Sequence, residues 1–131
     1  MFHKIRKELE KLNIGIVYVF GSRAQGLAKK DSDIDIGIVF SEPVENADLL
    51  LTYEKLYSLF LTANRKQQAE IDIVFLQSSS LALQFNVIKY GRVEYEISAK
   101  FRASYEEKIM LFHSDFEPVA KEFDEMILAR I

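Results

Sequence analysis

The strongest constraint on the fold of this chain is the alternation of short strand-like runs with stretches of helical periodicity. Three runs are rich in β-branched and aromatic residues: Ile14–Phe20, Asp33–Phe40 and Glu70–Leu76. Apolar residues recur at intervals of three and four in the stretches 2–12, 48–64 and 81–90. A fourth short run, Arg92–Ile97, has the length of an edge strand. This order predicts an α/β domain with a central mixed sheet of three to four strands flanked by helices.

Length and patterning indicate one domain with a helical extension. The 131 residues are enough for a single core, and we divide them into an α/β core, 1–98, and a helical tail, 99–131. The tail carries an apolar stripe spaced by three and four: Phe101, Tyr105, Ile109, Phe112 and Phe116. This stripe is wider than a small sheet needs for its own cover. We therefore expect part of the tail to form a partner surface or a homodimer interface.

Composition excludes several classes of function. The chain has no cysteine, which removes disulfides, thiolate zinc sites and cysteine nucleophiles. A net charge of −3 argues against a general nucleic-acid-binding surface. The charged start lacks the apolar stretch of a signal peptide, and the longest apolar run, Ile14–Phe20, is too short to span a bilayer. We expect a cytoplasmic protein with no membrane association and no direct nucleic-acid binding.

Three aspartates interrupt the apolar strands. Asp33 and Asp35 are two residues apart, so both side chains leave one face of the second strand, and Asp72 stands between two isoleucines of the third. Like charges on an apolar sheet repel one another, and a divalent cation, magnesium or manganese for all-oxygen ligands, offsets that cost. If the two strands pair, the three carboxylates can hold two metal ions for phosphoryl transfer. Glu70, on the same face as Asp72, is an alternative ligand. Solvated aspartates at a sheet edge are the simpler alternative.

A glycine turn follows the first strand. Gly21 lets the backbone approach a ligand closely, and the free N–H groups of a short helix from Ser22 to about residue 28 point toward an anion. With the Ser22 hydroxyl as a further donor and Arg23 near the phosphates, the turn is a candidate triphosphate site. The same residues also fit a capping box of Ser22 with Gln25 and an exposed arginine. The turn is informative chiefly through its spacing from the aspartates.

The order and spacing of these features resemble a known signature. Gly21-Ser22, ten intervening residues and then Asp33-Ile34-Asp35 closely resemble the motif of the minimal nucleotidyltransferases (MNT) of the DNA polymerase β-like superfamily. More narrowly, the chain looks like the antitoxin of MNT–HEPN toxin–antitoxin modules. The resemblance covers about residues 12–97. It implies a small nucleotidyltransferase fold in which Gly21 and Ser22 bind the triphosphate, Asp33 and Asp35 hold metal, and Asp72 completes the site and activates the acceptor hydroxyl.

The resemblance also implies a reaction and a partner. In the antitoxin branch, AMP passes from ATP, with magnesium, to a tyrosine of a HEPN-type ribonuclease toxin, which is thereby silenced. Two alternatives are a small-molecule nucleotidyltransferase of the aminoglycoside-modifying type and an antitoxin that neutralises its partner by contact alone. The first usually has an acceptor-binding helical domain, for which this chain has little room. The second has no need for aspartates in buried strands.

Overall fold

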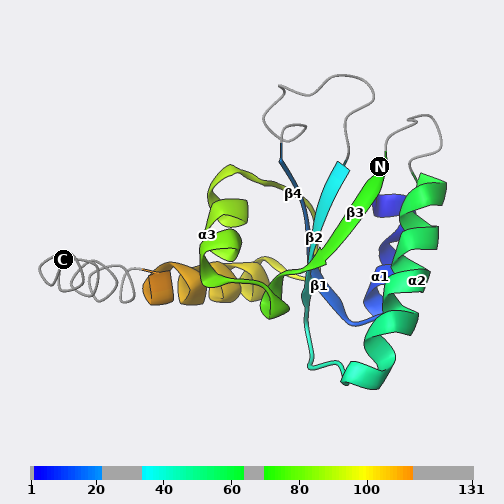
Figure 1. Ribbon diagram of the computed structural model, residues 1–131, viewed down its shortest axis with the longest axis horizontal. Helices are drawn as coiled ribbons and strands as arrows, with labels where there is room; N and C mark the ends of the chain where they lie inside the picture. The colour runs from blue at the N-terminus through cyan, green and yellow to red at the C-terminus, as the bar shows by residue number, and fades with distance from the viewer. Residues whose placement is uncertain (1, 22–33, 64–69, 114–131) are drawn as a thin grey trace, which may run out of the picture.

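The computed structural model describes residues 2–21, 34–63 and 70–113 (Figure 1). A 3₁₀ turn, η1, spans Phe2–Ile5 and leads into α1 (Arg6–Lys11). The four strands are β1 (Ile14–Phe20), β2 (Ile34–Phe40), β3 (Ile71–Phe75) and β4 (Arg92–Glu96). The remaining elements are α2 (Asn46–Ala63), the 3₁₀ turn η2 (Leu76–Ser78) and α3 (Leu81–Tyr90). Residues 99–113 are helical and form the described part of the tail.

The four strands form one mixed sheet in the order β3-β2-β1-β4. β1 runs antiparallel to both β2 and β4, whereas β2 and β3 are parallel. A parallel pair needs a crossover connection, and α2 lies in the chain between these two strands. The predicted mixed sheet with flanking helices is therefore confirmed, with β4 as an edge strand.

Helices cover both faces of the sheet, which makes three layers (Figure 1). The alternating isoleucines of β2 and β3 face α1 and α2, where they pack with Leu9, Leu56 and Phe60. The other face carries α3 and the helical segment 99–113, and its core includes Tyr18, Val39, Val87, Tyr105 and Ile109. Burial on both faces explains why β1 is an almost continuous apolar run.

Local signals account for where the elements begin and end. Asn13 has a φ of 58°, the left-handed conformation that terminates a helix. The Ser80 hydroxyl caps α3 by accepting a hydrogen bond from the backbone N–H of Leu83. Observed bounds differ from the predicted ones by one or two residues, as when α2 begins at Asn46 rather than Asp48.

The helical segment 99–113 packs closely on the sheet. At Gly15 of β1 a side chain would collide with the Phe101 ring, because a Cβ there would lie closer to the ring than van der Waals radii allow. The Tyr18 hydroxyl donates to Glu106 at 2.8 Å, and the Tyr105 hydroxyl donates to Gln84 of α3 at 2.8 Å. These two bonds, the first partly buried and the second buried, attach the segment to both β1 and α3.

The short helix expected after Ser22 lies outside the described residues, as do residues 114–131 of the expected helical tail. Within the part of the chain that the structure describes, none of the helices combines the length and apolarity needed to cross a bilayer.

Candidate functional site

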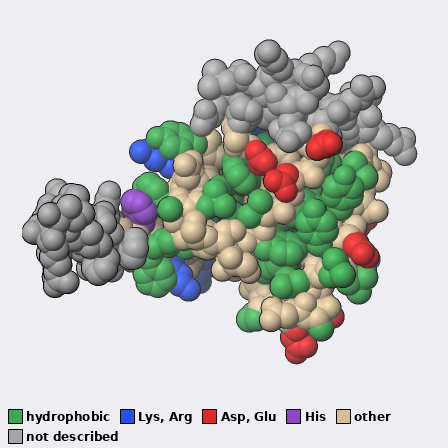
Figure 2. Space-filling model, in the orientation of Figure 1, with side chains coloured by type: hydrophobic (Ala, Val, Ile, Leu, Met, Phe, Trp, Pro, Cys, Tyr) green, Lys and Arg blue, Asp and Glu red, His purple; other side chains and the backbone are tan. Residues whose placement is uncertain are grey.

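Asp35 and Asp72 are direct neighbours in the sheet. Each is the second residue of its strand, and the parallel register of β2 with β3 places their Cα atoms opposite one another. Asp35 is half-buried and Asp72 is exposed. The predicted pairing of these strands therefore brings two of the three expected carboxylates together at the end of the sheet where β2 and β3 begin. Figure 2 shows acidic side chains gathered at this end.

The two carboxylates project from the face that carries α3 and the segment 99–113. Alternation along β2 puts Asp35 on the same side as Gly37 and Val39. Val39 belongs to the core on that side, and a Cβ at Gly37 would meet Leu76 of the same core. The isoleucines between these residues face α2 instead. Asp35 and Asp72 thus lie on this face, at the end of the sheet where β2 and β3 begin.

Gly21 lies against the Asp35 carboxylate. Phe20 is the register partner of Asp35, so the turn after β1 begins beside it. Gly21 has a φ of +80°, and a Cβ on it would lie 2.4 Å from Oδ2 of Asp35. The sequence predicted that Gly21 admits a ligand. In the described residues its immediate neighbour is the carboxylate itself, so no larger side chain fits without moving Asp35.

Three predicted site residues, Ser22, Arg23 and Asp33, lie outside the described residues. Within the described ranges, no cluster of three or more His, Cys, Asp or Glu side chains is arranged to hold a metal ion. The alternative ligand Glu70 is exposed, and its backbone carbonyl accepts the Ile34 N–H at 2.8 Å, which aligns the starts of β2 and β3. Two adjacent carboxylates, one of them lying against the backbone of Gly21, provide oxygen donors of the kind that a hard divalent cation prefers.

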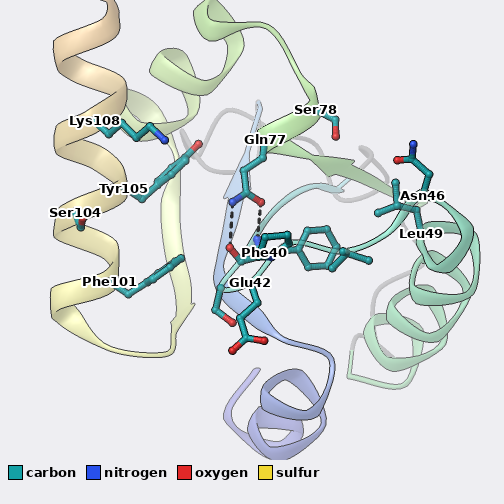
Figure 3. Close-up of a pocket in the computed structure, with 13 residues that line it drawn as sticks. Phe40, Glu42, Asn46, Leu49, Gln77, Ser78, Phe101, Ser104, Tyr105 and Lys108 are labelled. Atoms are coloured by element: carbon teal, nitrogen blue, oxygen red, sulfur yellow. Dashed lines mark hydrogen bonds between the residues drawn. The ribbon is translucent and has the colours of Figure 1, made fainter.

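The far end of β2 carries a residue that the sequence analysis did not single out. Gln77 accepts the Phe40 N–H at 2.7 Å through Oε1 and donates to the Phe40 carbonyl at 3.0 Å through Nε2 (Figure 3). Its amide thus bonds the last residue of β2 on the side where β3 has ended, while Ile14 of β1 is the register partner on the other side. A polar side chain after a strand is typical of a turn, so the sequence held no signal for this role.

A cavity of about 500 Å³ lies at this same far end, between the segment 99–113 and the start of α2 (Figure 3). Phe101, Tyr105 and Lys108 line one side, and Leu49 lines the other. Phe40, on its floor, is about 16 Å from Asp35 at the usual rise per strand residue. None of the residues predicted for the site lines this cavity. The chemistry indicated by the carboxylates belongs to the opposite end of the sheet.

Comparison with known protein families agrees with the fold. Residues 3–100 match the family model described as polymerase beta, nucleotidyltransferase. The chain belongs to this nucleotidyltransferase family. The match confirms the family predicted from the spacing of the glycine turn and the aspartates.

One relative and several solved structures resemble this nucleotidyltransferase. It is 30% identical over 88 residues to the protein adenylyltransferase MntA of Shewanella oneidensis. These matched residues make up 67% of this chain and 57% of that protein. The chain thus matches little more than half the length of this relative. A crystal structure of a toxin–antitoxin complex with AMP-PNP contains a chain with a TM-score of 0.68 and 22% identity, covering 95% of this chain and 96% of that one. A chain from the structure of the tri-AMPylated HEPN toxin of S. oneidensis in complex with the MNT antitoxin gives a TM-score of 0.62 at 18% identity, covering 98% of this chain and 99% of that one. At these identities the structural matches establish the fold.

Proposed function

We propose that this chain is a magnesium-dependent protein adenylyltransferase that moves AMP from ATP to a hydroxyl group, most simply a tyrosine, of a HEPN-type toxin and so acts as its antitoxin. The observation that carries the proposal is the pairing of Asp35 with Asp72 in register beside Gly21. The names of the similar proteins, an adenylyltransferase and the antitoxins of toxin complexes, support the choice of AMP and of a HEPN-type acceptor.

Each residue of the site has a distinct task in the proposal. Asp35 and Asp72, with Asp33 two positions before Asp35, would hold magnesium. When bound, the metal neutralises charge on the phosphates and on the leaving group. Gly21 lets the turn after β1 lie directly beside Asp35, and in the proposal the triphosphate binds at this turn, with Ser22 and Arg23 contributing donors to its oxygens. Asp72 is exposed and so stands where a macromolecular acceptor can reach it.

The reaction is a displacement at the α-phosphorus of ATP. The acceptor oxygen forms a bond to that phosphorus, and the bond to the oxygen bridging the α- and β-phosphates breaks. Pyrophosphate leaves, and the hydroxyl proton passes to a carboxylate, for which Asp72 is the candidate, and then to water. The product is an AMP phosphodiester on the acceptor.

Intact-mass spectrometry of both proteins tests this function. The full chain is incubated with ATP, magnesium and the HEPN-type product of the neighbouring gene. The partner should gain whole AMP units with the wild-type protein but not with Asp35→Asn or Asp72→Asn. Asp48→Asn is the matched control, because Asp48 is an exposed aspartate in the first turn of α2, away from the site.

The outcomes separate the alternatives. If the partner gains no mass but remains neutralised in a complex, the contact-only antitoxin replaces the transferase. If AMP is instead transferred to a small hydroxylated molecule supplied with ATP, the acceptor assignment is wrong and the nucleotidyltransferase activity stands. Equal activity in Asp72→Asn and Asp48→Asn would remove Asp72 from the site.

A further inference from the structure

The chain has six tyrosines, all of them in the described residues, and Tyr90 differs from the others in its exposure. Its side chain is 52% exposed at the last residue of α3. Three of the others are buried in the core: Tyr18, Tyr95 and Tyr105. The remaining two are half-buried on α2, which covers the face opposite to the carboxylates: Tyr53 and Tyr57. Tyr90 is therefore the most exposed tyrosine, and it belongs to a helix of the carboxylate face.

Tyr90 lies at the end of the sheet that holds the candidate site. β4 begins directly after the end of α3 and pairs antiparallel with β1, with Arg92 opposite Val19. One position nearer the end of the sheet, Gly91 is level with the β1 residue that pairs with Asp35. Figure 1 shows α3 leading into β4 at the end where β2 and β3 begin. The helix thus delivers Tyr90 to the same end of the sheet as the carboxylates.

The strand spacing gives the scale of the separation. Neighbouring strands lie about 4.8 Å apart, so the Cα atoms of Gly91 and Asp35 are about 10 Å apart, with β1 between them. Consecutive Cα atoms are about 3.8 Å apart, which places the Cα of Tyr90 within about 14 Å of that of Asp35. The tyrosine side chain and a nucleotide held at the carboxylates together bridge this distance.

The backbone next to Tyr90 is fixed by close packing. The Gly91 N–H donates to the Val87 carbonyl at 2.7 Å, and a Cβ on Gly91 would lie 2.4 Å from that oxygen. The same Cβ would lie 3.4 Å from the carbonyl oxygen of Val19, so β1 is close as well. Val87 is itself buried in the core of the carboxylate face. A hydroxyl carried on such a backbone needs little ordering to meet a bound substrate.

A cation accompanies the Tyr90 ring. The Nζ atom of Lys89 lies 5.2 Å from the ring centroid. An ammonium group this close favours the negative charge that develops on an attacking phenolic oxygen, and it attracts phosphate oxygens. Both effects assist a tyrosine that acts as a nucleophile toward a nucleotide.

We propose that Tyr90 is an acceptor for the chain's own nucleotidyl transfer, so that the protein AMPylates itself within one molecule. This inference rests on the proposed function for the transfer of AMP to a hydroxyl, and it adds a second acceptor to the HEPN-type protein. The Tyr90 oxygen forms a bond to the α-phosphorus of ATP, and the bond from that phosphorus to the oxygen bridging to the β-phosphate breaks. Pyrophosphate leaves, and the hydroxyl proton passes to a carboxylate, for which Asp72 is the candidate, and then to water.

Intact-mass spectrometry of the full chain, incubated with ATP and magnesium but without a partner, tests the inference. The wild-type chain should gain one AMP unit, and fragmentation should locate that unit on Tyr90. Tyr90→Phe removes only the hydroxyl of an exposed side chain and should abolish the gain. Tyr57→Phe is the matched control, because it removes the same group from the opposite face, and it should keep the gain. Asp35→Asn should abolish the gain although Tyr90 is present.

The dependence on protein concentration tests whether the transfer occurs within one molecule. The fraction of chains modified per unit time should be the same in dilute and in concentrated protein. A fraction that rises in proportion to the concentration would mean that one copy modifies another, and it would overturn the intramolecular step.

A parallel incubation with the HEPN-type product of the neighbouring gene separates this inference from the proposed function. An unmodified chain, or a gain that Tyr90→Phe leaves unchanged, overturns the inference even where the partner gains AMP. AMP on Tyr90 beside an unmodified partner supports the inference and refutes the acceptor of the proposed function. Tyr90→Phe should still transfer AMP to the partner, because Tyr90 is an acceptor and holds no part of the donor. If Tyr90→Phe loses both transfers, Tyr90 belongs to nucleotide binding and the inference is wrong.

Discussion

Alanine at position 21 tests the geometry of the site most sharply. The φ of +80° at Gly21 is a conformation that costs other residues about 1–2 kcal/mol. A Cβ would lie 2.4 Å from Oδ2 of Asp35, whereas ordinary contact begins at 3.4 Å. The carboxylate must therefore move by about 1 Å, and a misplacement of that size can lower a rate on the order of 100-fold. We expect Gly21→Ala to lower AMP transfer on the order of 100-fold and the free energy of unfolding by about 1–3 kcal/mol.

Asn13→Ala is the control for this experiment. Asn13 also has a positive φ, 58°, but it precedes β1 and lies at the other end of the sheet from Asp35. Rates are followed by the intact mass of the acceptor, and stability by urea unfolding. Asn13→Ala should lose stability and keep its rate. A Gly21→Ala protein with the wild-type rate, or a loss of rate equal to that of Asn13→Ala, would refute the role given to Gly21.

Three further predictions concern Gln77, Tyr18 and Tyr95, polar side chains on or next to the sheet. Gln77→Leu removes both hydrogen bonds to Phe40 and should lower the free energy of unfolding by about 1–3 kcal/mol in urea titrations; no change would show that the amide is dispensable. Burial and the hydrogen bond to Glu106 raise the pKa of Tyr18 above its ordinary value of 10.0, so the unfolded state loses this proton first. Stability should therefore fall as pH rises above about 10, by up to about 1.4 kcal/mol per pH unit, and Tyr18→Phe should make that slope shallower; an unchanged slope contradicts the assignment. The Tyr95 hydroxyl is buried without a hydrogen-bond partner among the described residues, so Tyr95→Phe should leave thermal stability unchanged or raise it, and a marked loss would reveal a missing partner.

The layers of the fold and the central pair of the site were predictable from residue patterns. Alternation along β2 and β3 separated the isoleucines from Asp35 and Asp72, and the structure places these two groups on opposite faces of the sheet. The pairing of Asp35 with Asp72 could be predicted only on the condition that β2 and β3 are neighbours in the sheet. Whether β2 and β3 are adjacent depends on the crossover through α2, and the periodicity within a single strand carries no information about that crossover.

Contacts between distant segments were not predictable in the same way. Gly21 was expected to face a ligand, yet the need for glycine arises from Asp35, which a strand alignment brings beside it. The spacing of Phe101, Ile109 and Phe112 predicted one stripe, but only the position of the sheet decides that Ile109 is buried and Phe112 exposed. Helical periodicity reports a face of a helix and carries no information about where the surface beneath it ends.

The most direct test of nucleotidyl transfer compares ATP labelled at the α-phosphate with ATP labelled at the γ-phosphate. Each is incubated with magnesium, the HEPN-type partner and either the wild-type chain or Asp72→Asn. The account predicts that the α-label alone becomes attached to the partner, only with the wild-type chain, and that pyrophosphate is released in equal amount. Transfer of the γ-label, or attachment of the α-label that is unchanged in Asp72→Asn, would contradict it.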